Sequence, residues 1–342
     1  MRVRMIALVA AAAFVGAAAA SGATPAAAAE RGPAVGPGLG VRLLDAPVAL
    51  AKDPRARTYI IDNVAPGHSI TRHLEVSNGT QQPLPITTYP DAATIDGGAF
   101  RVADGHAVND LVTWTTADPA SFTLAPGATR VVTVQINVPA DASAGERYGA
   151  VLAEARPASR SGQLTLISRV GVRMYLSVGP GGAPASNFAI DELQAQRNDA
   201  GDPVVQATVD NTGGRALDMS GTLRLTQGPG GLSAGPFPAK LGTTLAPGQT
   251  EPVTVVLDKA LPAGPWHARI DLRSDLLTKA AEAVITFPTQ DGATAVPVAA
   301  KSVPLTRNRN VIVPIALGLL LFLLLLLALV LWRRRARVAP AQ

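Results

Sequence analysis

The closest grouping of reactive side chains in the sequence is AGERYGA, residues 144–150, where Glu146, Arg147 and Tyr148 stand in a row between two glycines. A carboxylate, a guanidinium and a phenol at this spacing could carry out acid–base chemistry. The same residues could instead form the corner of a β-sandwich, where a glycine lets the chain reverse sharply before the next strand. The surrounding elements have to decide between these interpretations.

A similar corner occurs in the second half of the chain. Gly145 and Tyr148 in the first half correspond to Gly264 and Trp266 in the second. In a tyrosine corner the ring packs against the core and the hydroxyl bonds a nearby backbone group. An indole can replace a phenol in packing, but it cannot take over the proton chemistry of a catalytic tyrosine. We therefore interpret these four residues as structural corners.

Other candidates for catalysis or metal binding are scattered. The four histidines show no metal-ligand spacing; they are His68, His73, His106 and His267. The segment DASAG, residues 141–145, lacks the first glycine of a serine nucleophile elbow, and no phosphate-binding glycine loop stands between a strand and a helix. The sequence predicts no catalytic residue, no metal and no cofactor, and therefore a protein that is not an enzyme.

Four polar residues have more than one interpretation. Asp91 and Asp96 could be paired acids or part of a calcium loop, although turns formed by Asp and Gly are commoner. Asn78 begins an N-glycosylation triplet, but Asn-Gly at a strand end indicates first a turn. Arg72 falls in register with the apolar residues of its strand, so it lies either at a sheet edge or facing a binding groove.

Net charge gives no reason to expect a nucleic-acid partner. Of 30 Lys and Arg, two lie in the first 29 residues and four in the last ten, which leaves 24 against all 25 Asp and Glu. The intervening chain therefore has a net charge of about −1, and no basic stripe interleaved with aromatic residues is present. The sequence contains no cysteine, which excludes a disulfide framework and a thiolate metal site.

Alternating apolar and polar residues predict strands through most of the chain. TRVVTVQINV, residues 129–138, has this period of two, and so does the longer QLTLISRVGVRMYLSV, residues 163–178. LEVSNGT, residues 74–80, resembles ATVDNTG, residues 207–213, and an LAPG turn, a strand, a corner and an aromatic follow each of them. Two copies of one plan predict an all-β fold of two tandem Ig-like β-sandwiches.

The first 29 residues predict export. Arg2 and Arg4 precede a short apolar run, and small residues follow it. This is the layout of a secretory signal peptide, with cleavage after Ala29 or near Ala20.

The end of the chain predicts a membrane anchor. Residues 311–332 carry no charge, and as a helix they would span roughly 33 Å against roughly 30 Å of hydrocarbon. The stop-transfer charges follow at once; they are Arg333, Arg334, Arg335 and Arg337. We therefore expect a single-pass protein of the cell membrane, with its N-terminus extracellular and its C-terminus cytoplasmic.

The predicted organisation has seven parts. In chain order they are a signal peptide (1–29), a first sandwich (39–178), a linker (179–186), a second sandwich (187–288), an extended tether (289–310), a transmembrane helix (311–332) and a basic cytoplasmic tail (333–342).

With these residues in view, the chain resembles the WxL-interacting proteins, a family of surface proteins of Gram-positive bacteria. The matching stretches lie within about residues 39–178; they are GLGVRLLDAP, RTYIIDNVAPGHSITRHLEVSNGTQQPLPITTYP, LAPGATRVVTVQINVP, DASAGERYGAVLAEA and VGVRMYLSV. The resemblance implies a peptidoglycan-binding first domain, a second Ig-like domain and a C-terminal anchor. The second domain, AIDELQAQRNDAGDPVVQATVDNTGG onward, matches only the general plan. Contact residues for a ligand are not implied.

Three classes of function remain. The first is a membrane-anchored, non-enzymatic surface protein that binds peptidoglycan, an exported protein partner, or both; Tyr89 and Trp114 could stack on a glycan, although core packing is the commoner role for each. The second is a chaperone-like or assembly module that offers a sheet edge to a partner strand, with residues 163–178 as the strand concerned. The third is a wall-active hydrolase, for which the sequence lacks clustered acids or a Ser/His pair.

Overall fold

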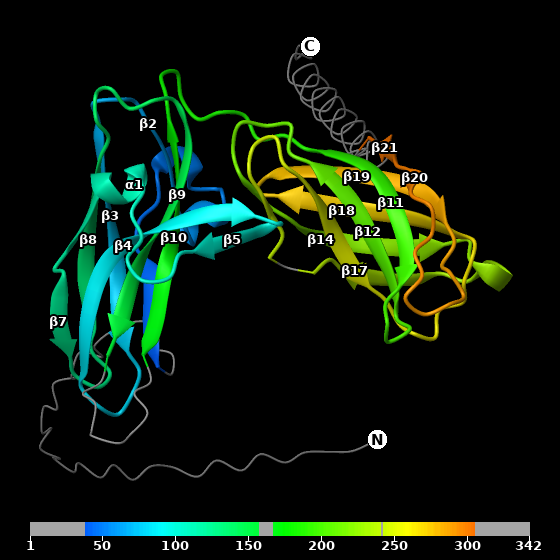
Figure 1. Ribbon diagram of the computed structural model, residues 1–342, viewed down its shortest axis with the longest axis horizontal. Helices are drawn as coiled ribbons and strands as arrows, with labels where there is room; N and C mark the ends of the chain where they lie inside the picture. Colours follow the sequence, from blue (N-terminus) through cyan, green and yellow to red (C-terminus); the bar gives the residue numbers. More distant parts are fainter. Residues whose placement is uncertain (1–37, 157–166, 241, 305–342) are drawn as a thin grey trace, which may run out of the picture. The chain divides into compact units, whose positions relative to one another are not determined.

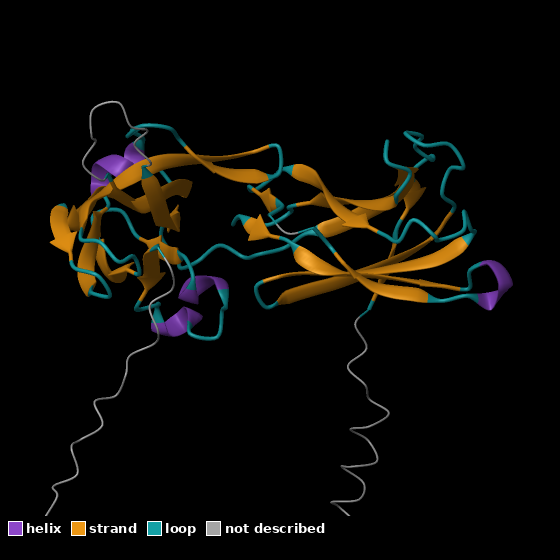
Figure 2. Ribbon diagram, turned by 90° about the horizontal axis from the view of Figure 1, so that it is seen from below, coloured by secondary structure: helices purple, strands orange, loops and turns teal. Residues whose placement is uncertain are grey.

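The computed structural model describes residues 38–156, 167–240 and 242–304. These residues form strands almost throughout, with helix only in short turns (Figure 2). The predicted all-β fold is therefore confirmed. No helix in these three ranges is long and apolar enough to cross a membrane. The predicted signal peptide, transmembrane helix and basic tail lie outside the described residues.

The first sandwich consists of two sheets that pack face to face (Figure 1). One sheet has the order β1 (Leu39–Leu43), β3 (Ser69–Asn78), β8 (Thr129–Asn137) and β6 (Thr115–Asp118). The other has the order β2 (Ile60–Val64), β10 (Ser168–Val178), β9 (Gly145–Ala155), β4 (Leu84–Asp96) and β5 (Ala99–Val102), and β7 (Ser121–Leu124) also pairs with β4. One short helix, α1 (Asp110–Trp114), precedes β6.

The core of the first sandwich follows the predicted alternation. Val132, Val134 and Ile136 of β8 are fully buried, and their polar neighbours face outward. On β10 the even-numbered residues from Val172 to Val178 are buried between the sheets. Because a strand turns successive side chains to opposite faces, one apolar series per strand is enough to hold the two sheets together.

The second sandwich also has two main sheets. One has the order β17 (Thr250–Val256), β12 (Pro203–Asp210), β11 (Ala189–Arg197) and β20 (Val298–Ala299). The other has the order β15 (Ala234–Pro238), β14 (Ser220–Thr226), β18 (Trp266–Ser274), β19 (Leu277–Ile285) and β21 (Lys301–Val303), and a small ribbon joins β13 (Leu217–Asp218) to β16 (Thr244–Leu245). The buried aromatic rings of Phe188, Trp266 and Phe287 lie in its core.

The two similar stretches of sequence, residues 74–80 and 207–213, share one hydrogen-bonding motif in the structure. Asn78 at the end of β3 donates from its side-chain amide to the carbonyl oxygens of Leu124 and Ala125, at 3.0 and 3.2 Å. Asn211 after β12 donates in the same way to Leu245, at 3.0 Å. In each half a buried asparagine therefore fixes the LAPG turn. Asn78 is fully buried, which excludes it as a glycosylation site in the folded protein.

The predicted tether needs correction. Residues 289–304 do not form an extended spacer, because they contain two strands of the second sandwich: β20 pairs with β11, and β21 pairs with β19. Ala295 and Ala300 pack against the core of that sandwich. The sequence pattern did not predict these strands, because the segment consists of small residues and two prolines and each strand is too short to show an alternation. The rest of the predicted tether, residues 305–310, lies outside the described residues.

Candidate functional site

The most distinctive surface of the first sandwich is the edge of its larger sheet at β10. Along its whole length β10 pairs with β9, from Ser168 opposite Ala155 to Val178 opposite Gly145. On its other side β2 pairs with it in parallel, but only over Met174–Val178. Within the part of the chain that the structure describes, residues 168–173 thus have a strand on one side only. We call these six residues the open edge.

An open edge of this kind presents unpaired backbone groups. Every residue of a strand carries one N–H and one C=O, and those that point away from β9 have no ladder partner among the described residues. Natural proteins usually protect such edges with prolines, bulges or very short strands. The open edge contains no proline, and its register with β9 is continuous. It can therefore accept an added strand.

The two faces of the open edge differ in chemistry. Val170 and Val172 point inward, and Val170 packs beside Leu39 and Val41 of β1, which borders the opposite sheet. The outward face carries Arg169, Gly171 and Arg173, opposite Glu154, Leu152 and Ala150 of β9. The inward side is thus apolar, and the outward side holds two arginines separated by a glycine.

A polar cluster surrounds Arg169 on the outward face. The guanidinium of Arg169 donates to Oε2 of Glu154 from Nε and Nη2, at 3.2 and 3.1 Å, and Arg156 donates to Oε1 at 2.9 Å. The hydroxyl of Tyr89 donates to the same carboxylate at 2.9 Å. Burial alone would raise the pKa of Glu154, but these hydrogen bonds outweigh it and hold the pKa below its ordinary value. One carboxylate is therefore shared by two arginines.

The three residues of the AGERYGA segment do not form an active site. Glu146 accepts a hydrogen bond from the backbone N–H of Ala216 at 2.6 Å and another from the hydroxyl of Tyr148 at 2.8 Å. Arg147 points elsewhere: its guanidinium donates to Asp110 and lies 4.8 Å from the centre of the Trp114 ring. Glu146 and Tyr148 thus bond to each other, whereas Arg147 lies beside Asp110 and Trp114, so the three side chains do not converge on one point.

The predicted corner residues lie where the two strands begin. Gly145 has φ +137° at the start of β9, and Gly264 has φ +116° just before β18. Trp266 is fully buried and donates from its indole nitrogen to the carbonyl oxygen of Pro262 at 2.9 Å. Tyr148 is half-buried, and its hydroxyl bonds the Glu146 carboxylate rather than the backbone group expected of a tyrosine corner.

Arg55 is the centre of a second cluster, which no pattern in the sequence predicts. It lies in a short 3₁₀ turn, Arg55–Arg57, and its side chain is nearly buried. Its Nε lies 2.7 Å from Asp218 and its Nη1 lies 3.2 Å from Asp275, both in the second sandwich. Burial opposes the charge of Arg55, but the two aspartates outweigh it and raise its pKa above the ordinary value. These contacts join segments more than 160 residues apart in the sequence.

Arg72 faces the interior of the first sandwich, which resolves its two interpretations. Its Nη2 donates to Oδ1 of Asp62 on β2 at 2.7 Å, so the ion pair bridges the two sheets. Burial raises the pKa of Asp62 to about 6, because desolvation outweighs the attraction of Arg72. Arg72 therefore lies in a buried ion pair and not in a binding groove.

The remaining sequence candidates stay apart from one another. Among the residues that the structure places, no three His, Asp, Glu or Cys side chains gather where they could hold a metal ion. Asp91 is fully buried and accepts from the backbone N–H of Ala92, at 2.9 Å, whereas Asp96 is exposed at the end of β4. Tyr89 is buried and stacks against His106, so it presents no free ring face for a glycan.

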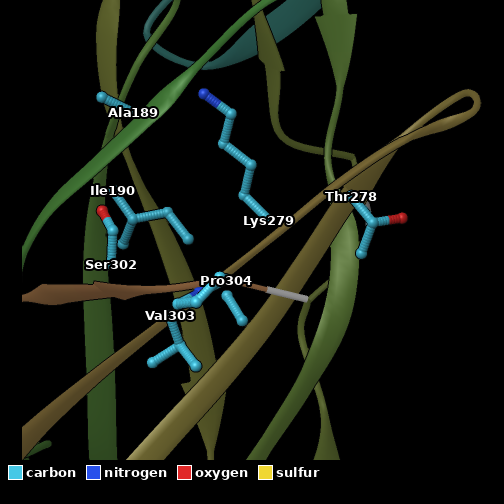
Figure 3. Close-up of a pocket in the computed structure, with 8 residues that line it drawn as sticks. Ala189, Ile190, Thr278, Lys279, Ser302, Val303 and Pro304 are labelled. Atoms are coloured by element: carbon cyan, nitrogen blue, oxygen red, sulfur yellow. The ribbon is translucent and has the colours of Figure 1, made fainter. Parts of the chain in front are cut away.

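A hollow of about 570 Å³ lies in the second sandwich, beside β19 and β21 (Figure 3). Small and apolar residues line most of it, with Lys279 as its one charged side chain. Figure 3 shows the amino group of Lys279 directed away from Val303 and Pro304. That amino group donates to the side-chain oxygen of Asn187 at 2.8 Å. The hollow therefore lacks convergent polar groups that could orient a small molecule.

No family model and no curated protein matches this sequence. Similar solved structures include the Escherichia coli chaperone DraB, with 13% identity over 71% of this chain and 95% of that chain, and a TM-score of 0.37. The YadV chaperone has 13% identity over 76% and 98% of the two chains, with a TM-score of 0.38. A structure of the Salmonella enterica SafA pilin in complex with the SafB chaperone has 12% identity over 78% and 97%, with a TM-score of 0.38. These values are too low to assign a family or a function.

Proposed function

We propose that this protein is a non-enzymatic binding module that takes up an extended segment of an exported protein partner as an added strand on the open edge. Such a module acts as a chaperone or in assembly, because it covers a partner segment without changing it chemically. The observation that carries the proposal is the one-sided pairing of residues 168–173 of β10.

The physical basis is β-strand addition. Backbone hydrogen bonds to an edge strand provide affinity that does not depend on the partner's sequence, and alternate side chains provide the selectivity. Apolar side chains of the partner would cover Val170 at the rim of the sandwich, next to Val41. Burial of this apolar surface adds to the free energy of binding.

Peptidoglycan binding, which the family resemblance implies, has less support. Tyr89 is buried, and Trp114 packs against the core with Arg147 over its ring. Neither ring offers an open stacking surface. A wall-active hydrolase would need clustered acids or a Ser/His pair. Asp218 and Asp275 do line one hollow together, but both are held in ion pairs with Arg55.

A fluorescent label at the edge provides the test. The natural chain has no cysteine, so Ser168→Cys places a single dye at the start of the open edge. Overlapping peptides from the exported proteins of the source organism are then added to the labelled protein. We expect signals from segments that alternate apolar and polar residues, and we expect the same peptides to slow hydrogen exchange at residues 168–173. Gln135→Cys, at an exposed site on β8 with strands on both sides, is the control for the label.

Substitution at the rim completes the test. Val170→Lys places a charge where the partner's apolar side chains would pack, so binding should weaken by at least about tenfold. Val131→Lys, on an outward-facing and half-exposed site of β8 opposite Glu75, is the matched control and should bind normally. Equal binding by both variants, or exchange protection confined to other strands, would exclude the open edge as the site.

A further inference from the structure

The chemistry of the open edge also specifies which segments it should prefer. A strand added beside β10 must turn alternate side chains to opposite faces. One series would lie next to Val170 and Val172, and the other next to Arg169, Gly171 and Arg173. Cross-strand neighbours interact directly, and opposite charges on one face stabilise the pairing. The charge balance of the outward face therefore decides which partner side chains fit.

Within the open edge itself that balance is positive, because residues 168–173 carry two arginines and no acid. Glu154 is the carboxylate beside Arg169, and Arg156 shares it. The carboxylate nearest to Arg173 is Asp218, whose oxygen lies 3.7 Å from Nη1, and Arg55 shares that one at 2.7 Å. Each of these two carboxylates thus serves two arginines. Arg169 and Arg173 keep about a third of their side-chain surface exposed, so they remain accessible to a further anion.

The same pattern disfavours pairing between two copies of this chain. If two open edges met in antiparallel register about Gly171, Arg169 of one copy would lie opposite Arg173 of the other. Like charges directly opposite each other destabilise a strand pair. The arginines therefore act against edge-to-edge self-association, which is a common hazard of an unprotected edge.

We infer that the open edge selects a partner segment that alternates apolar residues with acidic residues. This inference rests on the proposed function. The apolar residues face Val170 and Val172, and the acidic residues face Arg169 and Arg173. Because these arginines are four residues apart on one strand, the two acidic positions they favour are also four residues apart, or about 13 Å along the strand. The residue between them lies opposite Gly171.

Short synthetic peptides of matched length can test the inference on the full chain labelled at Ser168→Cys. The peptides alternate valine with aspartate, with asparagine or with lysine. We expect the aspartate peptide to bind about tenfold more tightly than its asparagine counterpart, the combined effect of two partly screened ion pairs, and the lysine peptide to bind least. High salt should reduce the preference for aspartate and leave the asparagine peptide nearly unaffected.

A pair of variants identifies the residues responsible. Arg169→Gln should reduce the aspartate-to-asparagine preference to about threefold or less, because one of the two ion pairs is lost. Arg42→Gln removes an exposed arginine from the outward face of β1 in the other sheet and should leave the preference unchanged.

The outcomes separate this inference from the proposed function. If the asparagine and aspartate peptides bind equally, strand addition stands and the acidic preference is wrong. If the lysine peptide binds best, the charge argument is overturned. If no alternating peptide binds, the proposed function itself fails. A concentration-dependent dimer in the absence of peptide would contradict the argument against self-pairing.

Discussion

At the residue scale, two buried arginines, Arg55 and Arg72, show how differently their ion pairs accommodate a buried charge. Arg55 has two aspartates, and its charge is favoured despite burial. Among the described residues Asp62 has only Arg72 as a close hydrogen-bonding partner, and the neighbouring carboxylate of Asp45 adds repulsion. Burial therefore dominates at Asp62 and raises its pKa to about 6.

This pKa implies a pH dependence of stability. An acid whose folded pKa lies above its unfolded value binds its proton more tightly in the folded state, so stability falls as pH rises from about 4 through about 6. Asp62 alone would account for a loss on the order of 3 kcal/mol across this window. Asp62→Asn cannot titrate, so its free energy of unfolding should decline less between pH 4 and pH 7. Urea denaturation at several pH values measures the free energy of unfolding of the variant and of the natural chain.

The control for this prediction is Asp141→Asn, in an exposed loop of the same sandwich. It should follow the pH profile of the natural chain. If the profiles of the Asp62→Asn variant and the natural chain run parallel, Asp62 titrates with an ordinary pKa and burial does not raise it.

At the element scale, the buried asparagines explain why two unlike halves share one plan. Asn211 donates to the carbonyl oxygens of Arg215 and Leu245, and its own side-chain oxygen accepts from the backbone of Gly213. A single side chain thus satisfies three backbone groups of two different loops. An asparagine is required here because its short side-chain amide combines two donor hydrogens with an acceptor oxygen.

Removal of this amide should be costly. Asn211→Ala leaves buried carbonyl oxygens without a donor, and we expect the free energy of unfolding to fall by about 2 to 3 kcal/mol. Asn137→Ala, an exposed asparagine on β8, should change it by less than about 0.5 kcal/mol. Chemical denaturation of both variants tests the motif. An Asn211→Ala variant as stable as the control would mean that water replaces the lost donors.

Much of the element scale could be predicted from the sequence, because strands and turns are local signals. The even-numbered apolar residues of β10 and the asparagine before each turn are visible in the letters themselves. The short strands β20 and β21 were missed, since two or three residues cannot show a period of two. The sequence predicts the strand β10 but not which of its residues lack a second neighbour. That depends on its pairing with β2, a segment over 100 residues away.

At the scale of the whole molecule, the contacts around Arg55 could not be predicted from the sequence. Its partners Asp218 and Asp275 lie more than 160 residues further along the chain, and no local pattern marks any of the three. Such pairs are set by how the strands are ordered in space. Their consequence is a direct connection between the two sandwiches. The hydrogen bonds from Ala216 to Glu146 and from Gln249 to Ile95 add to it, and so does the ion pair of Arg215 with Asp53.

This connection predicts how the molecule unfolds. Arg55→Met removes the guanidinium and leaves Asp218 and Asp275 without their shared partner, so stability should fall by about 3 to 5 kcal/mol. Because the aspartates belong to one sandwich and Arg55 to the other, the loss should also uncouple the two. Scanning calorimetry should then resolve two transitions, where the natural chain gives one. Arg57→Met, at an exposed arginine in the same turn that bonds only Ala51 among the described residues, is the matched control and should keep a single transition. One unshifted transition in Arg55→Met would mean that other contacts between the sandwiches keep them coupled without Arg55, such as the ion pair of Arg215 with Asp53 and the hydrogen bond from Gln249 to Ile95.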